Sequence, residues 1–275
     1  NEVVEAVDEV GMDAKDRRRF ASYLVNGVTL VIVTTDDLAG AHRIFDVMNM
    51  RGVPLTASDV FKAKTIAEIS PAARNAYATR YEVTMTRVTP LTRWDDIMDP
   101  LGDDSHTLEE FFSDLHLIVS HKAVCTQLLE EFRKDVLKPY VKKQNVISFI
   151  DDLLAPYANA WLILNRPTDA NLPDDIVAML VSLADYQTTD WKPVAMWALV
   201  NSIRNLGSAN AQVFSTPGNI GNETTNAHDE RLQLHDIDRL HDVLAALERV
   251  TGVDSLNRQS PLARRTRAAS AIRDL

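Results

Sequence analysis

The sequence predicts a mainly α-helical protein, a helical bundle with a small α/β remnant near the N-terminus. From Thr107 onward, apolar residues recur three and four positions apart almost continuously, which is the spacing of helices with one buried face. Residues 28–35, VTLVIVTT, are rich in β-branched side chains over the length of one strand. The chain has 45% hydrophobic and 25% charged residues, which is typical of globular domains with a proper core.

The elements divide into two predicted domains. Residues 1–70 form the α/β part, and residues 71–275 form the helical domain, in which we expect a flexible loop at about 208–230. The loop is expected because this stretch is rich in Ser, Asn, Thr and Gly and has little to bury. Within the helical domain, residues 193–199 are apolar nearly all round, so their helix should lie at the centre of the bundle.

Several junctions between elements are marked by their residue types. Residues 1–26 are predicted as two helices separated at Gly11, and the strand follows them. The turn 50–54, MRGVP, ends the next helix because Pro54 keeps the preceding residue out of the α region. Later, Thr107 with Glu110 predicts a capping box, and Pro139 and Pro156 predict a helix end and a kink.

Residues 44–62 also carry a recognisable pattern. The matching positions are Ile44, Phe45, Asp46, Asn49, Arg51, Gly52, Leu55, Thr56, Asp59 and Lys62. This pattern resembles the signature I-F-(E/D)-x-x-N-x-R-G-x-x-L-(T/S)-x-x-D-x-x-K of the GmrSD-type restriction endonuclease N-terminal domain, known as domain of unknown function 262. The resemblance implies a ParB-like α/β domain at 1–70, followed by a helical region, in antiphage-defence proteins that act on modified DNA.

The resemblance also implies further motifs in the longer protein to which this chain would belong, which we call the parent protein. In that family an Asp-Gly-Gln-Gln-Arg motif for nucleotide hydrolysis lies upstream, and a His-Asn-His nuclease domain often lies downstream. Neither is present in these 275 residues. We therefore expect a fragment of a longer polypeptide, whose partners are its missing N- and C-terminal domains and DNA. We expect no cofactor in this chain, and an NTP and a divalent metal in the parent.

The signature supplies the first candidate site, a nucleotide or DNA pocket. Its residues are Asn49, Arg51, Asp59 and Lys62, of which Arg51 and Lys62 would reach a phosphate. The structural alternative is that Asn49 ends a helix, Asp59 sits in a capping turn and Lys62 lies on the surface. The catalytic residues of the parent stay unknown.

The second candidate is the basic tail. Arg264, Arg265 and Arg267 are possible phosphate contacts, and the alternative is that the tail is a linker towards a following domain. The formal charge of −10 argues against a generally basic surface that coats DNA, but it is compatible with a local basic groove.

Other chemical patterns are weaker. The acidic stretch 91–105 is expected to be a solvated loop anchored by Trp94 rather than a hard-cation site. Cys125 is expected to be a small core residue on a helix. His235, Asp238 and Asp242 share a helical face, as charged residues on amphipathic helices do, so no metal site is predicted. No phosphate-binding loop or nucleophile motif occurs in the sequence.

The cellular setting follows from composition. A single cysteine cannot form an internal disulfide, and no uninterrupted apolar run approaches membrane-spanning length, so we expect a cytoplasmic protein with no membrane partner. The functional hypothesis is a fragment of a nucleotide-dependent, DNA-targeting restriction protein. The competing hypothesis is a non-catalytic helical scaffold or regulatory interaction module.

Overall fold

The structure is a computed structural model that describes residues 14–27, 61–63, 65–66, 69, 90–102, 104–142, 145–208, 213–214 and 232–275. These residues are 77% helical and contain no strand, only the isolated β-bridges Ala170–Phe214 and Ile203–Leu234. The prediction of a mainly α protein is confirmed. The predicted strand at 28–35, signature positions 44–60 and most of the loop at 208–230 lie outside the described residues, so the ParB-like remnant stays a prediction.

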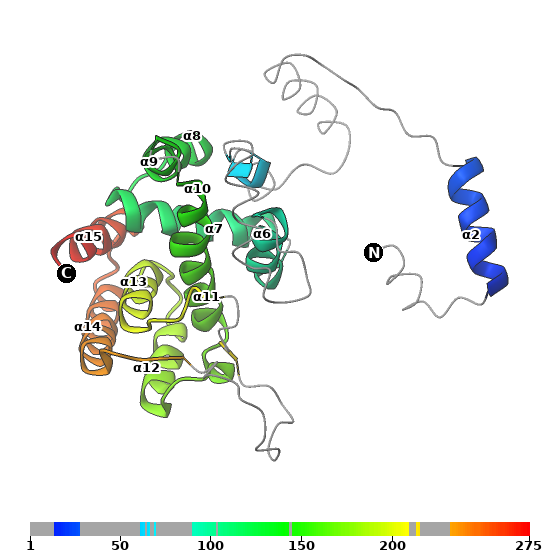
Figure 1. Cartoon of the computed structure of the whole chain (residues 1–275). Helices are drawn as coiled ribbons and strands as arrows, with labels where there is room; N and C mark the ends of the chain where they lie inside the picture. The colour runs from blue at the N-terminus through cyan, green and yellow to red at the C-terminus, as the bar shows by residue number, and fades with distance from the viewer. Residues whose placement is uncertain are drawn as a thin grey trace. The chain divides into compact units, whose positions relative to one another are not determined.

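The chain divides into two compact units, residues 1–54 and residues 55–275. In the first unit the structure describes helix α2, Ala14–Gly27. The longer helices of the second unit are α6 Pro90–Met98, α7 Ser105–Ser120, α11 Ala155–Asn165, α12 Asp174–Ala184, α13 Lys192–Ser202, α14 Ile237–Leu256 and α15 Pro261–Asp274 (Figure 1). Its short helical turns are η1 Asp99–Leu101, α8 Leu128–Phe132, η2 Arg133–Leu137, α9 Lys138–Lys142, α10 Val146–Ser148, η3 Phe149–Leu154 and η4 Pro167–Asp169.

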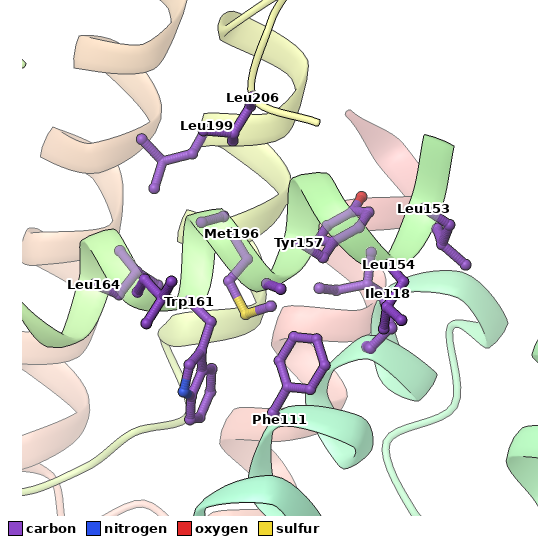
Figure 2. Packing of buried hydrophobic residues seen from close by; sticks show 14 of the residues in the cluster. Phe111, Ile118, Leu153, Leu154, Tyr157, Trp161, Leu164, Met196, Leu199 and Leu206 are labelled. Carbon is purple, nitrogen blue, oxygen red and sulfur yellow. The ribbon is translucent and has the colours of Figure 1, made fainter. Parts of the chain in front are cut away.

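Helices α11 and α13 form the centre of the second unit. Helix α13 packs against both α11 and α14, and most of its side chains are buried, as predicted for residues 193–199. In Figure 2, Trp161 of α11 lies close to Phe111 of α7 and Met196 of α13, and the two aromatic ring centroids are 5.9 Å apart. The helix Val146–Asn165 is long and apolar enough to cross a membrane, but 78% of its most apolar window is buried in this core.

Two prolines are accommodated by wide helical turns. Pro139 lies just after the π-helical turn η2, and Pro156 lies just after the π-helical turn η3. A proline lacks an N–H and its ring collides with the carbonyl four residues earlier, so a locally wider turn relieves the collision. The predicted helix end at Pro139 is therefore wrong, because the helix continues to Lys142.

Two other predicted elements are corrected. The stretch 91–105 is mostly helix α6 and turn η1 rather than a loop, because its apolar residues share one face and Pro90 stands at the first helical position, where no N–H is needed. Trp94 is buried, as predicted for an anchor. Helix α7 is capped by Asp104, which accepts hydrogen bonds from the backbone N–H and the hydroxyl of Thr107 at 2.8 Å each, so the predicted capping box does not open this helix.

A buried arginine joins three segments of the second unit. Nη2 of Arg93 on α6 donates to the carbonyl of Gly207 at 3.0 Å, and its Nε lies 3.6 Å from Oδ1 of Asp151 on η3. A Cβ atom at Gly207 would lie 2.9 Å from the Asp151 carbonyl oxygen and 2.9 Å from Cγ of Pro156. The turn after α13 therefore needs glycine because two backbones approach closely there.

Candidate nucleic-acid interface

A groove lined by four cations lies on the helix that runs through α8, η2 and α9. It has a volume of about 580 Å³. Its lining residues are Glu130, Glu131, Arg133, Lys134, Leu137, Lys138, Val141 and Lys142. We call this surface the α8–α9 groove. It brings four cations and two carboxylates together in a protein whose formal charge is −10.

The four cations of the α8–α9 groove are exposed and unpaired. Arg133, Lys134, Lys138 and Lys142 make no ion pair and no side-chain hydrogen bond with any residue that the structure describes. The three lysines follow one another at intervals of four residues, which places them along one side of a helix. Like charges at this spacing repel one another by roughly 0.2–0.5 kcal/mol per pair. A bound polyanion would remove this repulsion.

One of the two groove carboxylates is already engaged. Oε1 of Glu131 accepts hydrogen bonds from the backbone N–H of Thr126 at 2.9 Å, its hydroxyl at 3.1 Å and the backbone N–H of Gln127 at 3.1 Å. These bonds, first that of Gln127, lower the pKa of Glu131. The Glu131 carboxylate therefore holds the loop before α8, and the groove cations keep their capacity for an external anion.

The arginines of the tail have internal partners instead. Nε of Arg264 lies 2.7 Å from Oδ2 of Asp190, Nη1 of Arg265 lies 2.9 Å from Oδ1 of Asp114, and Arg267 forms an ion pair with Asp254. All three stand on α15, which packs against α7 and α13. The expectation of a linker is corrected by this helix. The pairing favours a structural role for the three arginines, and their contact with phosphate stays a prediction.

Two of these arginines, Arg264 and Arg267, also border a second hollow, of about 360 Å³. Its wall is mainly apolar, with Trp191, Val194, Leu247 and Val250 among its residues. An apolar wall gives no favourable contact to a phosphate backbone, so this hollow is a poorer candidate for a nucleic-acid interface than the α8–α9 groove.

The end of the signature is attached to the helical core. Phe61 is buried, and its ring centroid lies 4.4 Å from that of Phe112 and 4.6 Å from that of Phe132. Lys62 forms an ion pair with Asp95 of α6. The other signature candidates, Asn49, Arg51 and Asp59, lie outside the described residues, so the predicted pocket stays a prediction.

The weaker candidates of the sequence do not line the α8–α9 groove. Cys125 is half-buried in the loop 121–127 rather than on a helix, because α7 ends at Ser120 and His121 adopts a left-handed backbone with φ of 56°. Burial and the neighbouring Glu131 raise the pKa of the Cys125 thiol, so it is not an activated nucleophile. His235 precedes α14, while Asp238 and Asp242 are exposed on it.

Comparison with known proteins finds no matching family model, no matching curated protein and no matching solved structure. The resemblance to the GmrSD type therefore stands on residues 44–62 alone. The α8–α9 groove was not predicted from the sequence. Its lysines recur at intervals of four residues, and this pattern could have indicated a basic helix face.

Proposed function

We propose that this chain is part of a nucleotide-dependent, DNA-targeting restriction protein of antiphage defence resembling the GmrSD type, and that the α8–α9 groove contacts DNA phosphates. The observation that supports this best is the set of four exposed, unpaired cations on one groove. Lysine and arginine neutralise phosphates and release the counterions around DNA, which is the main source of sequence-independent affinity.

A comparison within the molecule supports the assignment. Where a cation holds the second unit together, it has a carboxylate within reach, as Arg93, Arg264 and Arg265 do. The groove cations have no such partner among the described residues. Because the protein is acidic overall, its remaining surface would repel DNA and confine the contact to this groove.

The groove would position the protein on the duplex but would not recognise the base sequence. Phosphate contacts fix where a protein lies on a duplex but carry no base information. In this proposal nucleotide hydrolysis and metal-assisted phosphodiester cleavage belong to the parent protein, with the signature residues Arg51 and Lys62 near the nucleotide. This chain alone would bind DNA without cutting it.

The experiment is duplex binding by the full chain, measured by fluorescence anisotropy at low salt. Lys138→Glu should weaken binding clearly, because it places a negative charge inside the groove. Arg249→Glu is the matched control, since Arg249 is exposed on α14 outside the groove and the substitution changes the charge equally. Equal binding by both variants would contradict the groove. Nucleotide-stimulated cleavage of modified and unmodified DNA by the parent tests the wider proposal.

The second candidate is a non-catalytic scaffold or regulatory module. It is favoured by the attachment of the signature to the core through Phe61 and Lys62. A scaffold would bind no DNA, and the parent carrying Arg51→Ala or Lys62→Ala would keep its nucleotide hydrolysis. Loss of hydrolysis in both variants would instead favour the nucleotide pocket.

A further inference from the structure

Three potential metal ligands converge where α7, the loop 121–127 and α8 meet. One ligand atom each of His116, Cys125 and Glu131 lies within 4.8 Å of the others. His116 comes from α7, Cys125 from the loop and Glu131 from α8. Their intervals in the chain match no metal-binding motif, so only the fold brings them together.

The His116 imidazole has one nitrogen occupied and one unpaired. Its Nε2 lies 3.2 Å from Oδ2 of Asp135, and Oδ2 also accepts from Nζ of Lys122 at 2.6 Å. Its Nδ1 is buried and has no hydrogen-bond partner among the residues that the structure describes, and the whole side chain is 0% exposed. A buried nitrogen without a partner destabilises a fold. A histidine that donates one ring N–H to a carboxylate and keeps the other nitrogen for a cation is the usual arrangement at metal sites.

The other two ligands are also held in place. Oε1 of Glu131 accepts three hydrogen bonds from Thr126 and Gln127, and these bonds fix the carboxylate and the loop that carries Cys125. Oε2 then remains available for a further ligand. Cys125 is half-buried, so solvent would reach a bound ion and a water molecule would complete its coordination.

We propose that His116, Cys125 and Glu131 bind a zinc-class divalent cation, with Asp135 orienting His116. A nitrogen, a sulfur and an oxygen donor suit Zn²⁺, whereas Mg²⁺ and Ca²⁺ take oxygen donors. On binding, the thiol releases its proton to solvent, so a thiolate, a carboxylate and a neutral imidazole balance the charge of the ion. The proposal does not require that the chain binds DNA, and this site differs from the site of the divalent metal expected in the parent.

The ion would hold the loop 121–127 between α7 and α8. Glu131 belongs both to this cluster and to the lining of the α8–α9 groove. Metal binding would therefore fix the first turn of the helix that carries the groove lysines. The consequence is measurable as a higher melting temperature in the presence of the metal.

The test is titration of the reduced full chain with Co²⁺, followed by absorption spectroscopy. We expect one equivalent to give a thiolate-to-cobalt charge-transfer band, which Zn²⁺ then removes. Cys125→Ser should abolish the band, since Cys125 is the only cysteine. Asp135→Asn should weaken binding roughly 10- to 100-fold, because the carboxylate that orients His116 is lost. His106→Gln, a change at an exposed histidine of α7, should leave binding unchanged.

Two results would overturn the proposal. The first is the absence of a charge-transfer band with wild-type protein. The second is a band that keeps its full affinity in both Glu131→Gln and Asp135→Asn, because the thiol would then bind cobalt alone. Glu131→Gln keeps a carbonyl oxygen to accept the bonds of Thr126 and Gln127, so it tests the ligand without releasing the loop.

Discussion

Arg265 on α15 donates from Nη1 to Oδ1 of Asp114 on α7 across 2.9 Å, and the Asp114 side chain is almost fully buried. Nη2 of Arg265 also lies 3.2 Å from the hydroxyl of Ser113. Burial raises the pKa of Asp114 to about 7, and the charge of Arg265 opposes that rise. Helix α15 is thus attached to α7 by hydrogen bonds from Arg265 to Ser113 and to a buried carboxyl group.

Arg265→Leu should destabilise the fold, because it removes the hydrogen bonds that Arg265 donates to Asp114 and Ser113 and leaves the buried Asp114 side chain without this partner. We expect a loss of about 1–3 kcal/mol in the free energy of unfolding, measured by urea denaturation. Arg273→Leu is the control, since Arg273 is exposed at the end of the same helix, and its cost should stay within about 0.5 kcal/mol. Similar losses in the two variants would contradict a special role for Arg265.

The Asp114 carboxyl should also shape the pH dependence of stability. Its folded pKa of about 7 lies above its ordinary value of 3.8, so the folded state binds the proton more tightly than the unfolded state. Its stabilising contribution is therefore complete below the ordinary pKa and is lost as the pH rises to about 7. Asp114→Asn should flatten this part of the stability curve, measured by denaturation across that pH range. An unchanged slope would contradict the assignment.

Gly207→Ala should destabilise the turn after α13 by about 1–3 kcal/mol, because the new methyl group would meet the Asp151 backbone and the Pro156 ring at 2.9 Å each. Gly252→Ala is the comparison. There the methyl group would meet the end of the Tyr186 side chain at 3.0 Å, which can move aside, and alanine favours the interior of α14. The melting temperature of Gly207→Ala should lie well below that of Gly252→Ala.

Phe61→Ala should release the end of the signature segment from the helical domain. The ring packs against Phe112 and Phe132 and is buried, so its removal should cost about 3–5 kcal/mol in the free energy of unfolding. In the parent protein this variant should also lower nucleotide-stimulated activity. If stability falls by less than about 1 kcal/mol, the packing at Phe61 does not attach the segment.

The helical architecture was predictable because it depends on local patterns. Residues 193–199 lie within buried α13, as their apolar composition predicts, and Trp94 is buried as an anchor. Helix α6 was missed because the acidic residues and prolines around Trp94 are also typical of a loop. The helix end predicted at Pro139 was wrong because the preceding π-helical turn accommodates the proline, and this turn has no clear sequence signal.

The sites were harder to predict because charge pairing is not local. Arg265 and Lys138 look equally basic in the sequence, but the partner of Arg265 lies 151 residues away, and Lys138 has no partner among the described residues. The cluster of His116, Cys125 and Glu131 was also not predicted, because only the turn between α7 and α8 brings these residues together. Sequence patterns could place the basic residues, whereas the fold decides which of them stay free for a ligand.

Phosphate binding by the α8–α9 groove is tested most directly by the salt dependence of duplex binding by the full chain. Each lost phosphate contact should reduce the slope of log K against log salt concentration by about 0.9. We expect a clearly shallower slope for the double variant Lys134→Ala and Lys138→Ala, and the wild-type slope for Arg249→Ala. A wild-type slope in the double variant would contradict a phosphate-binding role for the α8–α9 groove, and the scaffold function would then be the better account.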